Sequence, residues 1–250
     1  MIFNDENTGY IHSYLSGGTV DGPGIRFVLF MQTCPLRCRF CHNPDTWYYN
    51  ENNKIDVQRA LKLVLQYKDF YFATNGGITV SGGEPLMQPK FVLNLFKKLK
   101  EYNIHTCIDT SGYVDITKNI TDLIKYTDLF LVDIKHTNNE EHIKLTGKPN
   151  IKVINFLNAL LKHNKKIWIR QVIMPSVTDS SDYAESFINL IEPYRSIIDK
   201  VELLPYHTMG KDKWEKLNLK YTLDINPPDR ETLWFVKDKI EKNGYSVILS

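Results

Sequence analysis

Short apolar runs alternate with longer segments of helical periodicity along this chain of 250 residues. The runs are rich in β-branched and aromatic residues, and their near-continuous apolar character is typical of strands that are covered on both faces. Strands are predicted at 25–31, 77–81, 104–109, 128–134, 167–173 and 200–204, with a short closing strand at 246–249.

Apolar residues recur at helical spacing between these strands, which predicts amphipathic helices. Helices are predicted around 57–64, 92–99, 153–160, 183–194 and 228–242. Asp56 is expected to cap the first of them, and Pro89 to lie near the first turn of the second.

Strands that alternate with helices predict right-handed crossovers and a parallel sheet. The number of strand-then-helix units falls short of a closed barrel. We therefore expect an α/β protein with a partial (β/α)6 TIM-like barrel whose helices lie outside, although the pattern alone leaves a doubly wound sheet open. No linker, repeat or low-complexity segment is evident, so we expect a single domain, with 1–24 as an N-terminal extension, 25–210 as the barrel core and 211–250 as a closing segment.

Composition and charge exclude several classes of protein. The chain is 42% hydrophobic and 24% charged, as globular proteins commonly are. Its net charge of +2 is far from the concentrated positive charge of a nucleic-acid binder. No secretory signal and no apolar run of membrane-spanning length is visible. We expect a cytoplasmic monomer that binds neither nucleic acid nor membrane.

Polar side chains and glycines follow the predicted strands at their carboxyl ends. They are the cysteine loop after the first strand, then Ser81–Pro85, Asp109–Ser111, Asp133 with Lys135, Arg170–Met174 and Pro205–His207. In a barrel these strand ends meet on one face, where ligands bind. Their common position therefore favours one active site built from every strand.

Each of these residues also has a plainer role. Gly82 and Gly83 could form a turn, Asp109 could cap the next segment, and His207 could lie on the surface. Arg170 lies inside an apolar strand and needs a partner or a ligand under either interpretation. Cys107 is expected to be a small buried apolar residue.

Three cysteines, Cys34, Cys38 and Cys41, form C-x3-C-x2-C. A structural zinc site would need a fourth ligand, and His42 is too close to Cys41 along the chain to chelate the same ion well. Three thiols could also supply a disulfide, a catalytic zinc site or an iron–sulfur cluster. In a [4Fe–4S] cluster, three cysteines would leave one iron open for a substrate or cofactor.

The aromatic Phe40 completes the motif C-x3-C-x-aromatic-C. From Gly17 onward the chain resembles the radical S-adenosylmethionine (SAM) superfamily, and within it the glycyl-radical-enzyme activases. The resemblance rests on DGPGIRFVLFMQTCPLRCRFCHNPDTW, GGITVSGGEPLMQ, DTSG, LVDIKH, IWIRQVIMP and ELLPYHTMGKDKW. It implies an oxidoreductase that cleaves SAM reductively at a [4Fe–4S] cluster and takes a hydrogen atom from a backbone glycine of a partner enzyme.

The resemblance also implies a role for individual residues. The cluster ligands are Cys34, Cys38 and Cys41. The SAM contacts are Phe40, His42, Gly82, Gly83, Glu84, Lys135, Val172 and His207, of which Lys135 and His207 are candidates for catalysis. A monovalent cation, Na⁺ or K⁺, would be held by Asp109, Thr110 and Asp133. The glycine-containing peptide would meet Asp21 and Arg170.

Relatives that activate other glycyl radical enzymes often carry an inserted domain with further cysteine clusters, and this chain has none between Cys41 and the second predicted strand. The implied partner is therefore pyruvate formate-lyase (formate acetyltransferase), with a flavodoxin-like or ferredoxin-like electron donor. Three further functions stay open: an activase for another glycyl radical enzyme, radical SAM chemistry on a small molecule, and a non-catalytic metal-binding module.

Overall fold

The protein is described here from a computed structural model, which covers residues 5–250. Its chain forms two compact units. The first contains the chain up to Pro35, Thr46–Thr110 and Val114–Leu131, and the second contains Leu36–Asp45, Ser111–Tyr113 and Val132–Ser250. The division into an extension, a core and a closing segment stays a prediction.

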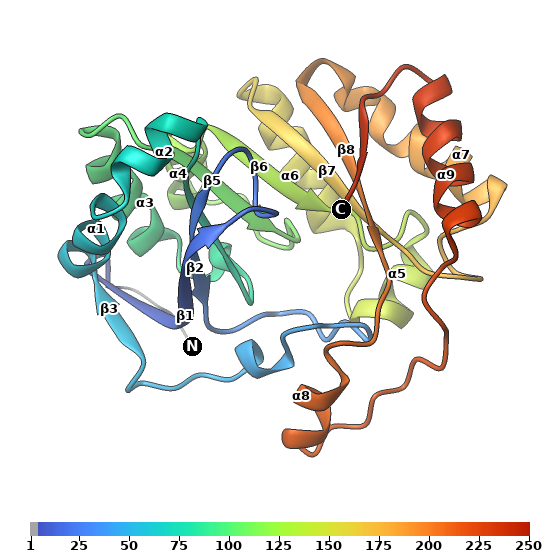
Figure 1. The fold of residues 1–250 in the computed structure, drawn as a ribbon, viewed down its shortest axis with the longest axis horizontal. Helices are drawn as coiled ribbons and strands as arrows, with labels where there is room; N and C mark the ends of the chain where they lie inside the picture. Colours follow the sequence, from blue (N-terminus) through green and yellow to red (C-terminus); the bar gives the residue numbers. More distant parts are fainter. Residues whose placement is uncertain (1–4) are drawn as a thin grey trace. The chain divides into compact units, whose positions relative to one another are not determined.

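The first unit holds a sheet in the order β3-β1-β2-β4-β5. Its strands are β1 (Thr8–Gly18), β2 (Arg26–Met31), β3 (Lys54–Asp56), β4 (Gly77–Gly82) and β5 (His105–Thr110). β2, β4 and β5 run parallel. β1 pairs with β2 and β3 in the antiparallel sense (Figure 1). The carboxyl ends of three parallel strands thus lie at one edge of this unit.

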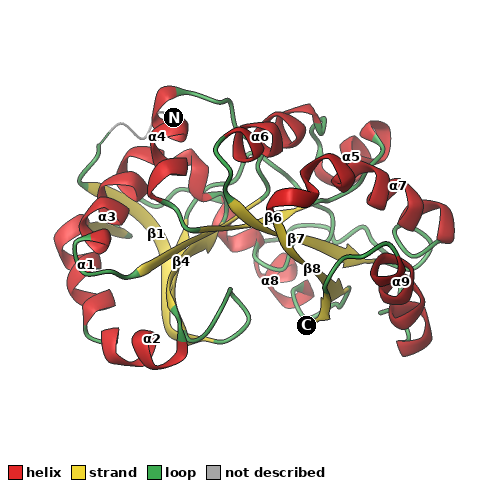
Figure 2. Ribbon diagram, turned by 90° about the horizontal axis from the view of Figure 1, so that it is seen from above, coloured by secondary structure: helices red, strands yellow, loops and turns green. Residues whose placement is uncertain are grey.

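Helices of the first unit alternate with its strands. They are α1 (Val57–Leu65), α2 (Lys68–Thr74), α3 (Pro89–Lys100) and α4 (Lys118–Tyr126), with a short 3-10 helix η2 at Pro85–Met87. Asp56 caps α1 by accepting a hydrogen bond from the backbone N–H of Arg59 at 2.8 Å, as predicted. Pro89 opens α3, also as predicted. Figure 2 shows these helices against the yellow strands.

The strand β6 (Leu129–Asp133) begins in the first unit and ends in the second. The residue before it, Asp128, donates its backbone N–H to the carbonyl of Thr106 at 3.0 Å. The residue after it, Ile134, donates to the carbonyl of Arg170 at 2.9 Å. β6 therefore lies beside β5 in one unit and beside β7 in the other.

The second unit continues the parallel pattern, with β7, β8 and β9 in this order. Its strands are β7 (Lys166–Ile173), β8 (Ile198–Pro205) and β9 (Val247–Leu249). Its helices are α5 (Asn139–Thr146), α6 (Ile151–Lys162), α7 (Ser181–Ile191), α8 (Lys211–Lys216) and α9 (Arg230–Lys242), with a 3-10 helix η3 at Glu192–Ile197. No helix among residues 5–250 has the length and apolar character needed to cross a membrane.

Each predicted strand is present, with its ends shifted by at most two residues. The mostly parallel α/β class is confirmed. The predictions missed β1, β3, α2, α4, α5 and α8. β1 is the instructive case, because it lies within the predicted N-terminal extension, whose first four residues are outside the described part. Its side chains are mostly half-buried or exposed, so the apolar signal that marks the central strands is weak there.

Candidate active site

The two glycines after β4 hold the chain close to the end of β2. Gly82 has φ +107°, and a Cβ there would overlap the backbone nitrogen of Met31. Gly83 donates its N–H to the carbonyl of Met31 at 2.9 Å, and Glu84 donates to the carbonyl of Thr33 at 2.8 Å. The Ser81–Pro85 segment is therefore fixed against the residues that lead into the cysteine loop.

Two carboxylates lie in hydrogen bonds at the carboxyl ends of β4 and β5. Glu84 is fully buried and accepts from the Thr110 hydroxyl at 2.6 Å and from the Leu86 N–H at 3.1 Å. Asp109 accepts from the Ser81 hydroxyl at 2.7 Å. The structure thus brings together, within the first unit, residues that the sequence assigned to the SAM amino group and to a cation.

The second and third cysteines of the loop lie in the second unit. The Cys41 N–H donates to the Cys38 carbonyl at 3.1 Å, which closes a turn between them. Two neighbouring backbone groups anchor the loop to α5, because Arg37 donates to Thr146 at 2.8 Å and Arg39 donates to Leu145 at 2.9 Å.

Burial affects the chemistry of the middle cysteine. It raises the pKa of the buried Cys38 thiol to about 12. A buried thiol of this kind stays protonated unless a metal binds the thiolate. The cysteines of residues 5–250 form no disulfide with one another.

Within the described part of the chain, no three His, Cys, Asp or Glu side chains gather as the ligands of a single metal ion would. A cubane cluster places no such demand, since each cysteine binds a different iron. The donor set of Cys34, Cys38 and Cys41 fits a [4Fe–4S] cluster. The cation site at Asp109, Thr110 and Asp133 stays a prediction.

Two histidines that the sequence assigned to SAM stack on each other in the second unit. The rings of His42 and His207 have centroids 3.8 Å apart and planes 22° apart. The Nε2 of His42 lies 3.1 Å from the His207 carbonyl, so it carries the proton and donates. Burial, and then the nearby His207, lowers the pKa of His42. A Cβ on Gly210 would lie only 2.8 Å from the Cα of His42, so this glycine allows the close approach.

The lysine after β6 lies between a carboxylate and an aromatic ring. The Nζ of Lys135 is 2.8 Å from Asp133 and 5.5 Å from the ring centroid of Phe40. The side chains of Lys135 and Asp133 are only 15% and 19% exposed. Phe40, Lys135 and Asp133 thus form a second predicted group that the fold brings together.

Arg170 has a charged partner, as expected for an arginine inside an apolar strand. Its Nε lies 3.0 Å from Glu202, and the two residues are register partners on β7 and β8. The Ser250 hydroxyl donates to the same carboxylate. Val172 is two residues along the strand from Arg170 and shares its face of the sheet.

Sequence reasoning missed Glu202 and Trp214 as supporting residues. The indole N–H of Trp214 donates to the Cys41 carbonyl at 2.8 Å. A signal for Glu202 was available, because it is a charged residue inside a predicted apolar strand, as Arg170 is.

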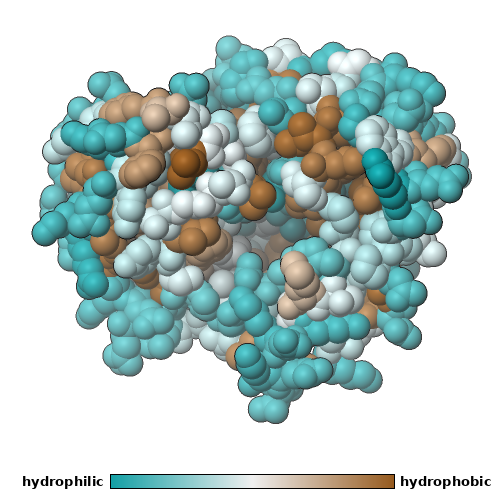
Figure 3. Space-filling view, viewed as in Figure 1, coloured by the Kyte–Doolittle hydropathy of each residue, from teal (hydrophilic) through white to brown (hydrophobic). Residues whose placement is uncertain are grey.

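Asp21 lies in the segment before β2, in the first unit. Its carbonyl accepts a hydrogen bond from the Thr79 hydroxyl at 2.6 Å. Apolar side chains are exposed nearby in sequence, with Tyr14 50%, Leu15 48% and Val20 60% accessible. Figure 3 shows a largely hydrophilic surface that is interrupted by apolar patches.

A family model described as a 4Fe-4S single cluster domain matches residues 20–154, which is more than half of the chain. The class is therefore that of proteins with a single [4Fe–4S] cluster. A radical SAM methyltransferase from Sphaerobacter thermophilus has a similar fold, with a TM-score of 0.62 and 16% identity over 93% of this chain and 71% of that one.

A pyruvate formate-lyase-activating enzyme from Staphylococcus epidermidis is 47% identical over 245 residues, covering 94% of this chain and 96% of the relative. A domain of the pyruvate-formate lyase-activating enzyme from Bacteroides vulgatus matches 70% of this chain and 99% of its own, with a TM-score of 0.59 and 19% identity. The chain belongs to the family of the pyruvate formate-lyase-activating enzymes.

Proposed function

We propose that this protein installs a glycyl radical on pyruvate formate-lyase. The observation that carries the proposal is the 47% identity to a pyruvate formate-lyase-activating enzyme over nearly the whole chain. The three-cysteine loop and the two groups of strand-end residues support it, because they supply the residue types that the reaction needs.

Cys34, Cys38 and Cys41 would hold the cluster. When bound, the cluster supplies one electron that splits SAM into methionine and a 5′-deoxyadenosyl radical, which takes a hydrogen atom from the partner's glycine to give 5′-deoxyadenosine and the glycyl radical. The burial of Cys38 keeps water from this part of the loop. Trp214 and the backbone bonds of Arg37 and Arg39 hold the loop in one conformation.

The remaining SAM contacts fall into two chemical kinds. The backbone of Gly82 and Gly83 and the carboxylate of Glu84 suit the ammonium of the methionyl group. Phe40, His42, Val172 and His207 offer rings and apolar surface for the adenosine, and Lys135 offers a positive charge at a fixed position beside Phe40.

Asp109, Thr110 and Asp133 would bind a monovalent cation, because hard oxygen ligands suit Na⁺ or K⁺. Asp109 and Thr110 lie in hydrogen bonds to neighbouring side chains, which orients their oxygens.

Asp21 and Arg170 would contact the glycine-containing peptide. Glu202 holds the Arg170 guanidinium, which leaves its position well defined for a peptide carbonyl. A flavodoxin-like or ferredoxin-like donor would supply the electron, and the protein would act as a monomer in the cytoplasm.

The test is anaerobic incubation of the cluster-loaded protein with SAM, a low-potential reductant and pyruvate formate-lyase. A glycyl radical signal in electron paramagnetic resonance, with one 5′-deoxyadenosine formed for each radical, is the expected result. SAM cleavage without a radical on pyruvate formate-lyase, but with one on another glycyl radical enzyme, would change the partner. Zinc in place of iron, with no SAM cleavage, would show a non-catalytic metal-binding module instead.

A further inference from the structure

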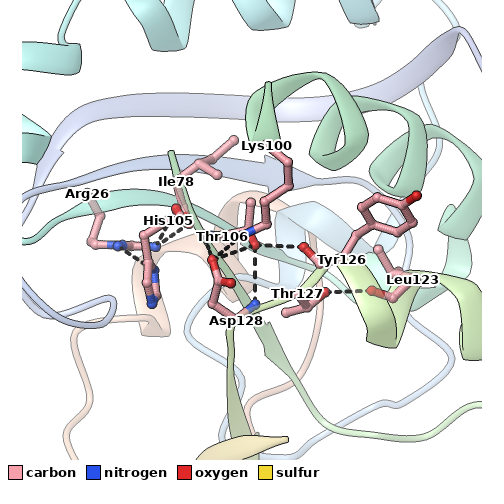
Figure 4. A network of polar contacts seen from close by, with 9 residues as sticks. All are labelled: Arg26, Ile78, Lys100, His105, Thr106, Leu123, Tyr126, Thr127 and Asp128. Atoms are coloured by element: carbon pink, nitrogen blue, oxygen red, sulfur yellow. Dashed lines mark hydrogen bonds and ion pairs between the residues drawn. The ribbon is translucent and has the colours of Figure 1, made fainter. Parts of the chain in front are cut away.

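Arg26, the first residue of β2, is a fully buried arginine that the proposed reaction does not use. Its Nε donates to the Thr79 hydroxyl at 2.9 Å. Its other nitrogens contact the Ile78 carbonyl and, at 3.2 Å, the Nδ1 of His105 (Figure 4). Burying a guanidinium has a large cost in desolvation free energy unless its N–H groups donate to acceptors within the protein. The contacts of Arg26 therefore show what it holds in place.

The hydrogen bonds run in one direction through Thr79. A hydroxyl has a single proton, and Thr79 gives it to the carbonyl of Asp21 at 2.6 Å. The oxygen of Thr79 must then accept from Arg26, which is a donor only. Arg26 thus fixes the hydroxyl of Thr79, and Thr79 fixes the backbone of Asp21.

The carboxylate of Asp21 is confined as well. A Cβ on Gly18 would lie 2.6 Å from the Oδ2 of Asp21, so the carboxylate rests against the bare backbone at the end of β1. The next residue, Gly22, has φ +123°, and a Cβ there would lie 3.7 Å from both the Thr79 hydroxyl and the Cys107 sulfur. The Asp21–Gly22 segment therefore lies directly over Thr79 and Cys107.

The place of Thr79 on β4 shows how near the Asp21–Gly22 segment is to the carboxyl ends of the strands. Thr79 pairs with Cys107 in the parallel register of β4 and β5, and Ser81 is two residues beyond Thr79 on the same face. Ser81 binds Asp109 and lies about 7 Å along β4 from Thr79, so the residue that holds Asp21 is two positions before that pair on the same face.

We propose that Arg26 and Thr79 are positioning residues for the glycine-containing peptide, which they serve by setting the place of Asp21. The proposal rests on the proposed function, in which Asp21 contacts that peptide. Neither residue touches the peptide, so their effect should fall on recognition of the partner rather than on the chemical step.

The test compares Thr79→Val with Thr79→Ser and Thr106→Val. Valine keeps the shape of threonine without its hydroxyl, whereas serine keeps the hydroxyl. Thr106 is equally buried on β5, and its hydroxyl donates at 2.9 Å to the Tyr126 carbonyl (Figure 4). Because Thr106 pairs with Ile78 and not with Thr79, its side chain lies on the opposite face of the sheet.

Thr79→Val is expected to raise KM for pyruvate formate-lyase about tenfold while kcat and KM for SAM stay within about twofold, as the loss of one buried hydrogen bond predicts. Amide hydrogen exchange at Asp21, Gly22 and Gly24 should be faster by a similar factor. Thr79→Ser should restore both quantities, and Thr106→Val should leave both at their wild-type values.

A folded, iron-loaded Thr79→Val protein with wild-type KM for the partner and wild-type exchange would overturn the proposal. If the wild-type protein makes no glycyl radical, the proposed function is wrong, and the exchange data alone then decide whether Thr79 holds the segment. If Thr79→Val does not fold, Thr79→Ala compared with Thr79→Ser gives the same contrast, and equal KM and exchange in that pair would reject the proposal.

Discussion

The two ends of β2, β4 and β5 use buried polar side chains in opposite ways. At the carboxyl ends, carboxylates are gathered, with Glu84 held by a hydroxyl and a backbone N–H and Asp109 by a hydroxyl. At the amino ends the buried cation is the guanidinium of Arg26. It contacts His105, and the negative charge of Asp128 is nearby (Figure 4). All three nitrogens of the Arg26 guanidinium are engaged by protein groups.

This difference separates a region that serves ligands from one that serves the fold. Parallel strands present their carboxyl ends to ligands, so polar groups there can act on a bound molecule. The enclosed network at the amino ends has its donors matched by acceptors within the chain. Substitutions at the carboxyl end should therefore cost activity directly. Those at the amino end should mainly cost stability, and Arg26 and Thr79 should affect activity only through the position of Asp21.

The largest effect is expected in the loop that follows the carboxyl end of β2. Cys34→Ala, Cys38→Ala and Cys41→Ala should each lose bound iron and SAM cleavage, because each removes one thiolate from the cluster. Cys107→Ala is the matched control, since Cys107 is fully buried inside β5. Iron analysis and 5′-deoxyadenosine production provide the measurements. Loss of the cluster in Cys107→Ala, with cluster retained in any of the other three, would reverse the ligand assignment.

Next in size is the loss of the cation at the amino end. Arg26→Met should lower the free energy of unfolding by about 3 kcal/mol, because it leaves buried acceptors without their donor. Urea unfolding of the variant and the wild type measures the change. A loss below about 1 kcal/mol, the range of surface substitutions and exposed pairs, would show that the network is not a stabilising feature.

The pH dependence of stability reports on the same network. Burial, and then Arg26, lowers the pKa of His105 to about 4. The unfolded chain therefore binds more protons than the folded one between that value and the ordinary histidine pKa, so stability should fall by about 2 kcal/mol as the pH drops through this range. His105→Asn keeps an acceptor for Arg26 and should flatten the profile. An unchanged pH profile in this variant would assign the dependence to other groups.

The smallest effect is expected at the partly exposed pair of Lys100 and Asp128, which borders the buried polar contacts of Arg26. Lys100 pairs with Asp128, and their side chains are 29% and 38% exposed. Lys100→Met should cost only about 0.5 kcal/mol, because solvent screens such a pair. Lys98→Met, in the same turn of α3, controls for the loss of a positive charge near the end of a helix. A loss of unfolding free energy as large as that of Arg26→Met would mean that the Lys100–Asp128 pair and the buried contacts of Arg26 stabilise the protein cooperatively.

The sequence predicted the central strands and the main helices because their patterns are local. It missed β1, whose side chains are mostly half-buried or exposed, and β3, whose three residues are too few to show a clear pattern. The candidate site was predicted in the same way. Glu84, Asp109 and Lys135 were found by their place after a strand, which can be read within a few residues.

The partners of those residues could not be predicted in this way. The stacking of His42 on His207 joins residues 165 positions apart, and the bond from Trp214 to Cys41 spans 173. Arg26 and His105 are 79 positions apart. Such contacts depend on which residues of distant strands, helices and loops lie side by side. The periodicity within one segment indicates its secondary structure but does not specify its distant partners.

The sequence by itself determined the central strands, the main helices and the cysteine spacing, because short spacings and periodic patterns act through neighbouring residues. The reaction class was implied by the resemblance of its motifs to a known family. Only the tertiary structure decided that Arg26 would be enclosed, that Thr79 would hold Asp21 and that Glu202 would hold Arg170. The physical reason is that a buried polar group must find its partner wherever the packed chain provides one, however distant in sequence.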